Sequence, residues 1–482
     1  MPLPTILHIN LDAENQSLPK YKQLADAIVS QIKTGILKSG DMLPSSREMA
    51  QQLGVSRKTI VAATELLVLK RWLVSKDRVG LFVAGPSPSA AKPAVRHDSP
   101  VAGMTFGGDH QAASNMLVVN DGFPDTQLMP FREFSRTYRQ VFNRAAQWQN
   151  LGYGSAVGYH RFRHSLTTML GSSRGLGVED NELCIVRGSQ MALFLIANAV
   201  LSAGDHVAIE SPGYEQACRT FKAAGLVVHE IPVDGDGLDT EHLARLCQDT
   251  ELHAVYVTPR YQYPTTVTLS QKRRQQLCDL SVAHGFFVIE DDFGADFQFS
   301  GKHQLPLSAM LPKSHYLYVG TFSKIFAPAI RVGYVASSAE VIQRIANYRS
   351  LVDIQGDAIT ERALNELYDN GDMQRHIRRT SRIYKERLDF VSKEIRRLQS
   401  KYISYHRPIG GLAIWLNLGH ANLEFMQWLL REQNVSVPLF MLSDGSLGAR
   451  IGYASLTEEQ VTKVLTAIAD CTADFFENHV ID

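Results

Sequence analysis

Apolar and polar residues follow two different patterns along the chain, and the change of pattern divides it into parts. In residues 18–34, apolar side chains recur at helical spacing: Tyr21, Leu24, Ile28 and Ile32. Further along, short apolar runs are separated by stretches of helix length, and they occupy residues 206–210, 254–259, 286–292 and 316–320. Alternation of this kind predicts an α/β domain built on a mainly parallel sheet.

Between these two regions, residues 85–100 are rich in Pro, Ala and Ser and show no apolar period. This is the composition of a linker, and we extend it to residue 115. The sequence therefore predicts a first domain in residues 1–84, a linker in residues 85–115 and a large domain in residues 116–482.

Composition narrows the class of protein. Lys plus Arg and Asp plus Glu number 49 each, but residues 1–84 carry 11 basic and 7 acidic side chains, a net charge of +4. This lean is compatible with a nucleic-acid-binding module. The five cysteines form no CxxC pair, which argues against a disulfide framework and predicts no metal site. No apolar run approaches the roughly 20 residues of a membrane helix, so we expect a cytoplasmic protein without membrane association.

Residues 43–72 predict two short helices joined at Gly54. Ser45 or Ser46 can cap the first helix, and Ser56 can cap the second, whose first turn exposes Arg57 and its neighbours. Such a pair is typical of a helix-turn-helix, in which the second helix reads the major groove. Residues 72–84 predict a two-stranded wing, and its tip carries two side chains that can meet phosphates, Lys76 and Arg78. A small helical domain with a basic surface is the alternative.

The segment LPSSREMAQQLGVSRKTIVAATELL closely resembles the winged-helix domain of GntR-type bacterial regulators. The resemblance implies a double-stranded DNA operator as partner. It also implies the DNA-contacting residues Ser46, Arg47, Ser56, Arg57 and Thr59, with Gly80 as the wing glycine. The wing SKDRVGLFV departs from the glycine-rich tip common in that family.

In the large domain, Lys324 lies in the segment GTFSKIFAPAIRVGY, between small hydroxyl residues and an arginine. A lysine that forms a Schiff base with pyridoxal 5'-phosphate (PLP) needs a fixed, dry position, a phosphate anchor, a stacking face and an acid beside the ring nitrogen. The sequence offers a candidate for each role: Lys324 for the Schiff base, Asp291 for the ring nitrogen, Tyr214 for stacking, and Thr321, Ser323, Arg331 and the backbone N–H groups of Ser189 and Gln190 for phosphate. Taken singly, these residues are more often a surface charge, a helix cap or a loop anchor; their combination predicts a PLP pocket.

The same segment resembles the cofactor-lysine segment of fold-type I aminotransferases, in the version found in MocR/GabR-type regulators, which fuse a GntR winged helix to an aminotransferase-like domain. Further matches follow in the family's order: YGSAVGYHRFRHSL, RGSQMAL, GDHVAIESPGY, IEDDFGADFQF and ARIGYAS. The resemblance implies an α/β fold-type I domain with a mainly parallel sheet and a small C-terminal α+β subdomain. It also implies a homodimer, and Arg450 as the residue that binds an effector carboxylate.

The sequence departs from the family at the pocket. Phe293 stands where the family usually has a tyrosine that donates to the cofactor's phenolic oxygen, and Arg260 and Tyr261 stand where serine and histidine are usual. Tyr261 or Tyr263 is a candidate to return a hydroxyl group to the site. Gln216 replaces an arginine of the GABA-responsive member, so GABA is not expected as effector unless Arg260 or Arg219 substitutes.

Our leading hypothesis is a PLP-dependent transcriptional regulator whose large domain senses PLP itself or a PLP–amine aldimine, and which is not primarily an enzyme. The alternative is a catalytically active aminotransferase with an accessory DNA-binding domain, supported by Lys324, Asp291 and Arg450 but opposed by Phe293. A third hypothesis is a regulator that no longer binds the cofactor and keeps the domain for dimerisation.

Overall fold

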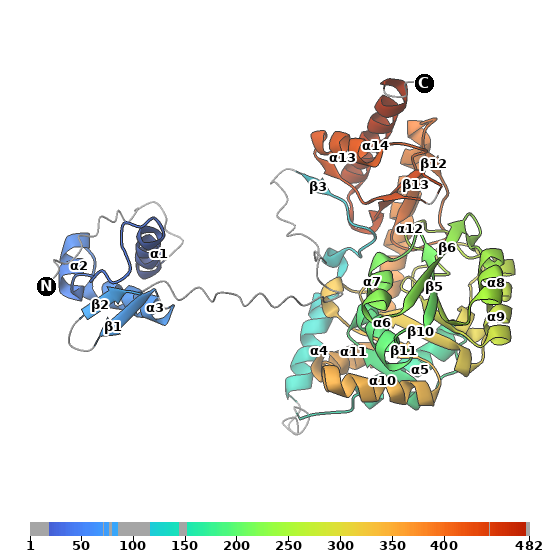
Figure 1. Ribbon diagram of the computed structural model, residues 1–482, viewed down its shortest axis with the longest axis horizontal. Coiled ribbons are helices and arrows are strands. Elements are labelled where there is room, and N and C mark those ends of the chain that lie inside the picture. The colour runs from blue at the N-terminus through green and yellow to red at the C-terminus, as the bar shows by residue number, and fades with distance from the viewer. Residues whose placement is uncertain are drawn as a thin grey trace. The chain divides into compact units, whose positions relative to one another are not determined.

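The computed structural model describes residues 19–70, 72–76, 80–84, 116–143, 152–442 and 444–478. The chain divides into two compact units, Met1–Ala102 and Gly103–Asp482 (Figure 1). The predicted linker, residues 85–115, lies outside the described residues, so the boundaries at 84 and 115 remain predictions. No helix in the described ranges is both long and apolar enough to cross a membrane.

The first unit contains three helices followed by an antiparallel hairpin: α1 (Lys20–Lys33), α2 (Ser46–Leu53), α3 (Arg57–Leu69), β1 (Leu73–Lys76) and β2 (Gly80–Val83). Ser45 caps α2 in a reciprocal capping box with Glu48, and Gly54 ends that helix at φ 62°. Ser56 caps α3 by accepting from the backbone N–H of Thr59. The apolar faces of the three helices meet in one core, which includes Leu24, Ile28, Met49, Ile60, Leu67, Leu73 and Val83.

The second unit is built on a large sheet. Among the described residues, eight strands lie in the order β4-β11-β10-β9-β8-β5-β6-β7. Their bounds are β4 (Leu183–Val186), β5 (His206–Ser211), β6 (Val227–Asp234), β7 (Gly237–Leu238), β8 (Leu252–Val257), β9 (Phe287–Asp291), β10 (Tyr316–Thr321) and β11 (Gly333–Ala336). Only β11 and β7 run against the others. The predicted mainly parallel sheet is confirmed.

Helices cover both faces of this sheet, and successive strand residues point alternately into the two cores that result. In β8, for example, Val255 and Val257 belong to one core cluster, while Ala254 and Tyr256 belong to the other. One face packs against α6 (Gly188–Ala199), α7 (Glu215–Ala223) and α10 (Ala339–Val352). The other packs against α4 (Phe131–Asn143), α5 (His160–Arg174), α8 (Thr240–Asp249), α9 (Gln271–His284) and α11 (Ala358–Asp369).

A smaller subdomain follows in the chain and is coloured orange to red in Figure 1. Its antiparallel sheet has the order β12 (Ser404–Tyr405), β13 (Ile414–Asn417), β16 (Leu447–Ile451) and β15 (Leu439–Met441), and it packs with α12 (Asp372–Leu398), α13 (Leu423–Glu432) and α14 (Glu458–Asn478). One strand comes from much earlier in the chain: β3 (Leu117–Val118) pairs in parallel with β14 (Val435–Ser436). The segment after β3 is thereby led past the carboxyl ends of the large sheet.

Candidate functional site

A cavity of about 240 Å³ lies where β5, β8, β9 and β10 end. Carboxyl ends of parallel strands are where open α/β sheets bind ligands. The cavity is lined by Asp121, Phe123, Ser189, Tyr214, Tyr256, Thr258, Tyr263, Asp291, Phe293, Thr321, Ser323, Lys324, Pro328, Arg331 and Arg450. The structure thus brings together every residue that the sequence predicted for the pocket, except Gln190.

Lys324 follows β10, and its amine is enclosed in the cavity although the side chain as a whole is only partly buried. Its Nζ atom donates to the backbone oxygen of Gly122 at 2.9 Å. It also lies 5.0 Å from the ring centroid of Phe123 and 5.8 Å from that of Phe293. Burial lowers the pKa of Lys324 to about 8. A neutral, nucleophilic amine is therefore available near physiological pH.

Asp291 ends β9 and is almost fully buried. Its Oδ2 atom accepts from the hydroxyl group of Tyr256 at 3.1 Å, whereas its buried Oδ1 atom has no hydrogen-bond partner among the described residues. Burial raises the pKa of Asp291 to about 7. A carboxylate in this position gains most from a cationic partner inside the cavity, and a protonated pyridine nitrogen is such a group.

Several donors for an anion gather around the start of α6. The helix begins at Gly188, so the backbone N–H groups of Ser189 and Gln190 lie in its first turn and have no partner within the helix. Gly188 has φ 76°, and a Cβ atom there would come within 2.9 Å of the Arg331 guanidinium. The buried Oγ atom of Ser323 has no described partner. These donors fit a dianionic phosphate, and together with Lys324 and Asp291 the residues present fit PLP.

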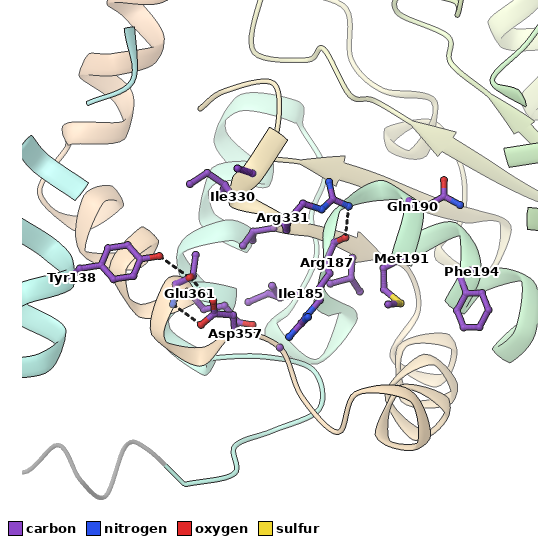
Figure 2. Close-up of a pocket in the computed structure, with 15 residues that line it drawn as sticks. Tyr138, Ile185, Arg187, Gln190, Met191, Phe194, Ile330, Arg331, Asp357 and Glu361 are labelled. Carbon is purple, nitrogen blue, oxygen red and sulfur yellow. Dashed lines mark hydrogen bonds between the residues drawn. The ribbon is translucent and has the colours of Figure 1, made fainter. Parts of the chain in front are cut away.

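Gln190 contributes its side chain elsewhere. Its Nε2 atom donates to Thr220 at 2.6 Å, and the residue lines a larger cavity of about 690 Å³. Figure 2 shows Gln190 and Phe194 at one end of this cavity and Tyr138 at the other. Arg331 lines both cavities, and its Nη2 atom donates to the backbone oxygen of Arg187 at 3.0 Å. Any role of Gln190 in phosphate binding would rest on its backbone N–H.

Tyr214 and Arg450 line the cavity and both contact the ring of Tyr263. The rings of Tyr214 and Tyr263 meet edge to face, 5.5 Å apart, and burial raises the pKa of Tyr214 to about 12. The Arg450 guanidinium lies over the Tyr263 ring at 4.8 Å. It donates from Nε to the backbone oxygen of Asp121 at 2.7 Å and from Nη1 to that of Pro264 at 2.6 Å. Two backbone carbonyl groups therefore fix Arg450 in the cavity wall.

In the first unit, the predicted DNA-contacting residues lie at the starts of α2 and α3 and in the wing. Arg57 donates from Nε to the Ser46 hydroxyl at 3.2 Å, which ties the two helix starts together. The Ser56 and Thr59 hydroxyls lie 2.9 Å apart, and Arg47 is exposed at the start of α2. The remaining two predicted residues belong to the wing. Lys76 ends β1 and lies 4.7 Å from the ring centroid of Phe82, while Arg78 lies outside the described residues.

Comparison with known families identifies both units. Residues 20–83 match the family described as bacterial regulatory proteins, gntR family, and residues 123–468 match aminotransferase class I and II. The chain belongs to the class I and II aminotransferase family and carries a GntR domain. The predicted fusion of a GntR winged helix with an aminotransferase-like domain is confirmed.

Two regulators align with this chain along almost their whole length, and an aminotransferase structure matches its second unit. The chain is 25% identical over 481 residues to the probable rhizopine catabolism regulatory protein MocR of Rhizobium meliloti, covering 96% of this chain and 95% of that protein. It is 27% identical over 464 residues to the pyridoxine biosynthesis transcriptional regulator PdxR of Corynebacterium glutamicum, covering 95% and 97%. A crystal structure of Pyrococcus horikoshii kynurenine aminotransferase superposes on 78% of this chain and 97% of its own, with a TM-score of 0.73 at 23% identity, which shows the shared fold.

The structure shows where the residues lie at which this sequence departs from the aminotransferase pattern. Phe293 does line the cavity. Arg260 faces away from the cavity, because its guanidinium is held by both carboxylate oxygens of Asp292, at 2.7 and 3.0 Å. Arg219 pairs with Glu215. Neither arginine lines the cavity, and the expectation that GABA is not the effector stays a prediction.

Of the two tyrosines considered for a returned hydroxyl group, only Tyr263 lines the cavity of this family member. Tyr261 donates instead to the backbone oxygen of Phe297 at 3.0 Å. Sequence reasoning missed Asp121, whose Oδ2 atom accepts from the Tyr263 hydroxyl at 3.0 Å. The available signal was the turn NDGFPD, in which Gly122 has φ 116°, but nothing in that turn indicates which way Asp121 points.

Proposed function

We propose that the chain is a PLP-dependent transcriptional regulator that acts in the cytoplasm, binds operator DNA and senses either PLP or an amine that reacts with bound PLP. The observation that carries this proposal is that the Lys324 amine and the Asp291 carboxylate line the same cavity. The chain that holds them also carries a GntR domain. The names of the MocR and PdxR relatives support a regulatory role.

The residues of this chain divide the work of holding the cofactor. Bound PLP supplies an electrophilic aldehyde to which amines attach reversibly. Lys324 provides the attaching amine, and its surroundings keep a neutral fraction available near pH 8. Asp291 would hold a proton on the ring nitrogen, and Arg331 would bind the phosphate together with the start of α6. Arg450 is left to orient the carboxylate of an incoming amino acid.

Sensing requires that the ligand bind one conformation of the protein better than another. The test uses full-length protein loaded with PLP, an operator fragment from its own promoter region, and fluorescence anisotropy recorded with the visible spectrum. We expect operator affinity to change by at least about fivefold on addition of PLP or of an amine that moves the visible band. Unchanged affinity in both titrations would contradict a sensory role.

A working aminotransferase is the second candidate, because Lys324, Asp291 and Arg450 share one cavity. Phe293 counts against it: without the tyrosine hydroxyl of the family, control over the protonation state of the lysine–cofactor linkage is weaker. Steady release of a 2-oxo acid from an amino acid would support the enzyme. A band that shifts without product supports the sensor.

Arg57→Ala is expected to weaken operator binding by about tenfold while leaving the visible spectrum unchanged. Arg57 lies in the first turn of α3, the helix that such domains place in the major groove. Lys70→Ala is the matched control, since it removes one exposed positive charge at the opposite end of the same helix. Equal losses in both variants, measured by anisotropy at fixed salt, would remove Arg57 from base recognition and leave only a general charge effect.

We also propose a homodimer formed through the face around the larger cavity (Figure 2). Leu351, at the end of α10, is 82% exposed, Ile354 just after that helix is 50% exposed, and Tyr153 is 84% exposed. Contiguous exposed apolar side chains mark association surfaces. Leu351→Glu should raise the dimer dissociation constant at least about tenfold in sedimentation equilibrium. Val282→Glu, at an exposed position of α9, should not, and an unaffected dimer in both variants would place the interface elsewhere.

A further inference from the structure

The backbone of Asp121 and Gly122 organises three charged side chains around the PLP cavity. The carbonyl oxygen of Asp121 accepts from Arg450 and that of Gly122 accepts from Lys324. The Asp121 side chain faces the same cavity and accepts from the Tyr263 hydroxyl. One turn of backbone therefore fixes a guanidinium, an amine and a carboxylate relative to one another.

Charge balance singles out Asp121 among these groups. Under the proposed function, Asp291 would be matched by the cofactor's ring nitrogen and Arg331 by its phosphate. Arg450 is matched by the carboxylate of an amino acid. The Lys324 and Arg450 cations lie near enough to attract Asp121 electrostatically, but Asp121 forms no direct ion pair with any described Lys, Arg or His side chain, and a hydroxyl group is its only described side-chain donor. A partly buried carboxylate beside a second, incoming carboxylate is unfavourable unless a cation accompanies them.

We infer that Asp121 recognises a second cationic group on the effector, an inference that rests on the proposed amine-sensing function. The effector is then a small α-amino acid whose short side chain ends in an ammonium group. Its α-amine would take the place of the Lys324 amine on the cofactor and so release Lys324 as a free amine, its carboxylate would meet Arg450, and its second ammonium group would meet Asp121. The Phe123 ring, already 5.0 Å from the Lys324 amine, adds an aromatic face on which a cation is stable. The cavity of about 240 Å³, shared with the cofactor, leaves room for a small amine.

The test is a visible-spectrum titration of the PLP-loaded full chain with three amino acids of equal carbon-chain length. L-Ornithine carries a terminal ammonium group, L-norvaline a methyl group and L-glutamate a carboxylate. We expect the half-saturating concentration of ornithine to be at least about tenfold below those of norvaline and glutamate, the size of one charge-assisted contact. Norvaline or glutamate matching ornithine would overturn the role of Asp121 but leave the amine sensor intact. A band that none of the three moves would overturn the inference and direct the proposed function to PLP itself.

Two variants separate the charge of Asp121 from its hydrogen bond. In Asp121→Asn, the ratio between the norvaline and ornithine values should fall towards one. In Tyr263→Phe, the hydrogen bond is lost but the carboxylate remains, so the preference for ornithine should persist. A preference that survives Asp121→Asn, or that is lost only in Tyr263→Phe, would overturn the inference. The visible band of each variant before titration reports that its cofactor site is formed, and the titration of the native chain tests the inference without any variant.

Discussion

Lys324→Ala is expected to abolish the visible band of the lysine-bound cofactor while leaving a folded protein. No other lysine lines the cavity among the described residues, so no second amine is placed to replace it. Alanine removes a long side chain from a half-buried position that is bordered by aromatic rings, and the loss of stability should stay within about 2 kcal/mol. Circular dichroism and a melting curve check the fold, and the spectrum checks the attachment.

Lys302→Ala is the matched control for that experiment, because Lys302 is an exposed lysine of the same unit. Borohydride reduction followed by mass spectrometry should place the cofactor on the peptide that contains Lys324 and nowhere else. The attachment rate should also rise with pH and reach half of its maximum near pH 8, since the neutral amine is the nucleophile. A band retained in the alanine variant, or a modified peptide elsewhere, would exclude Lys324 from this role.

The sequence predicted the large sheet well because strands buried on both faces have short, continuous apolar sequences. All four runs proposed as strands are strands of that sheet: β5, β8, β9 and β10. The helices of the GntR domain were equally readable, since serine caps and Gly54 mark their ends locally. The sequence did not predict β3, whose two residues pair with a segment more than 300 positions away in the chain. No local pattern encodes such a partner.

The pocket was predictable where the family fixes a residue at a strand end, as for Asp291, Lys324 and Arg450. The sequence did not predict which side chains of a loop point into the cavity and which point away from it. Arg260 and Tyr263 lie three positions apart in one loop, yet Arg260 binds Asp292 outside the cavity and Tyr263 lines the cavity. The direction of each side chain is set by the carboxylate that it meets, Asp292 for Arg260 and Asp121 for Tyr263, and that information lies in the tertiary structure.

A sensor and an enzyme place different demands on the same cavity. An enzyme must move protons on bound substrate, which requires donors matched in pKa to the reacting groups. A sensor needs only to hold the ligand and register which one has arrived. The cavity keeps its charged anchors, Asp291, Arg331 and Arg450, but has an apolar Phe293 where the family usually donates a hydrogen bond. This combination favours binding over turnover.

Asp291→Asn is the second variant with a large expected effect. Its effect on the free energy of unfolding depends on pH. In the cofactor-free protein, burial raises the pKa of Asp291 from 3.8 to about 7. The folded protein therefore holds a proton that the unfolded chain releases between these values. Stability contributed by this group is present below pH 4 and is lost as the pH rises to 7. A difference of this size corresponds to about 4 kcal/mol at most, and relaxation should reduce the measured penalty to roughly 1–3 kcal/mol.

Asparagine removes this penalty because it is neutral at every pH and its oxygen can still accept from Tyr256. The cofactor-free variant should therefore unfold at higher denaturant concentration than the native protein at pH 8, and the difference should vanish near pH 4. Loaded with PLP, the order should reverse, since the variant cannot keep the ring nitrogen protonated and binds the cofactor less tightly. A variant that is less stable than the native protein at pH 8 without cofactor would contradict an unpaired Asp291.

The neighbouring carboxylate provides the control with the opposite sign. Asp292 is equally buried, but the Arg260 guanidinium outweighs burial and holds the pKa of Asp292 below its usual value. Tyr318 donates to the same carboxylate at 3.0 Å. Asp292→Asn leaves a buried guanidinium uncompensated, so it should cost about 3–5 kcal/mol at pH 8. Two adjacent aspartates would then respond oppositely to the same substitution, because Asp292 already has its cation within the protein, whereas Asp291 is proposed to meet one on the cofactor.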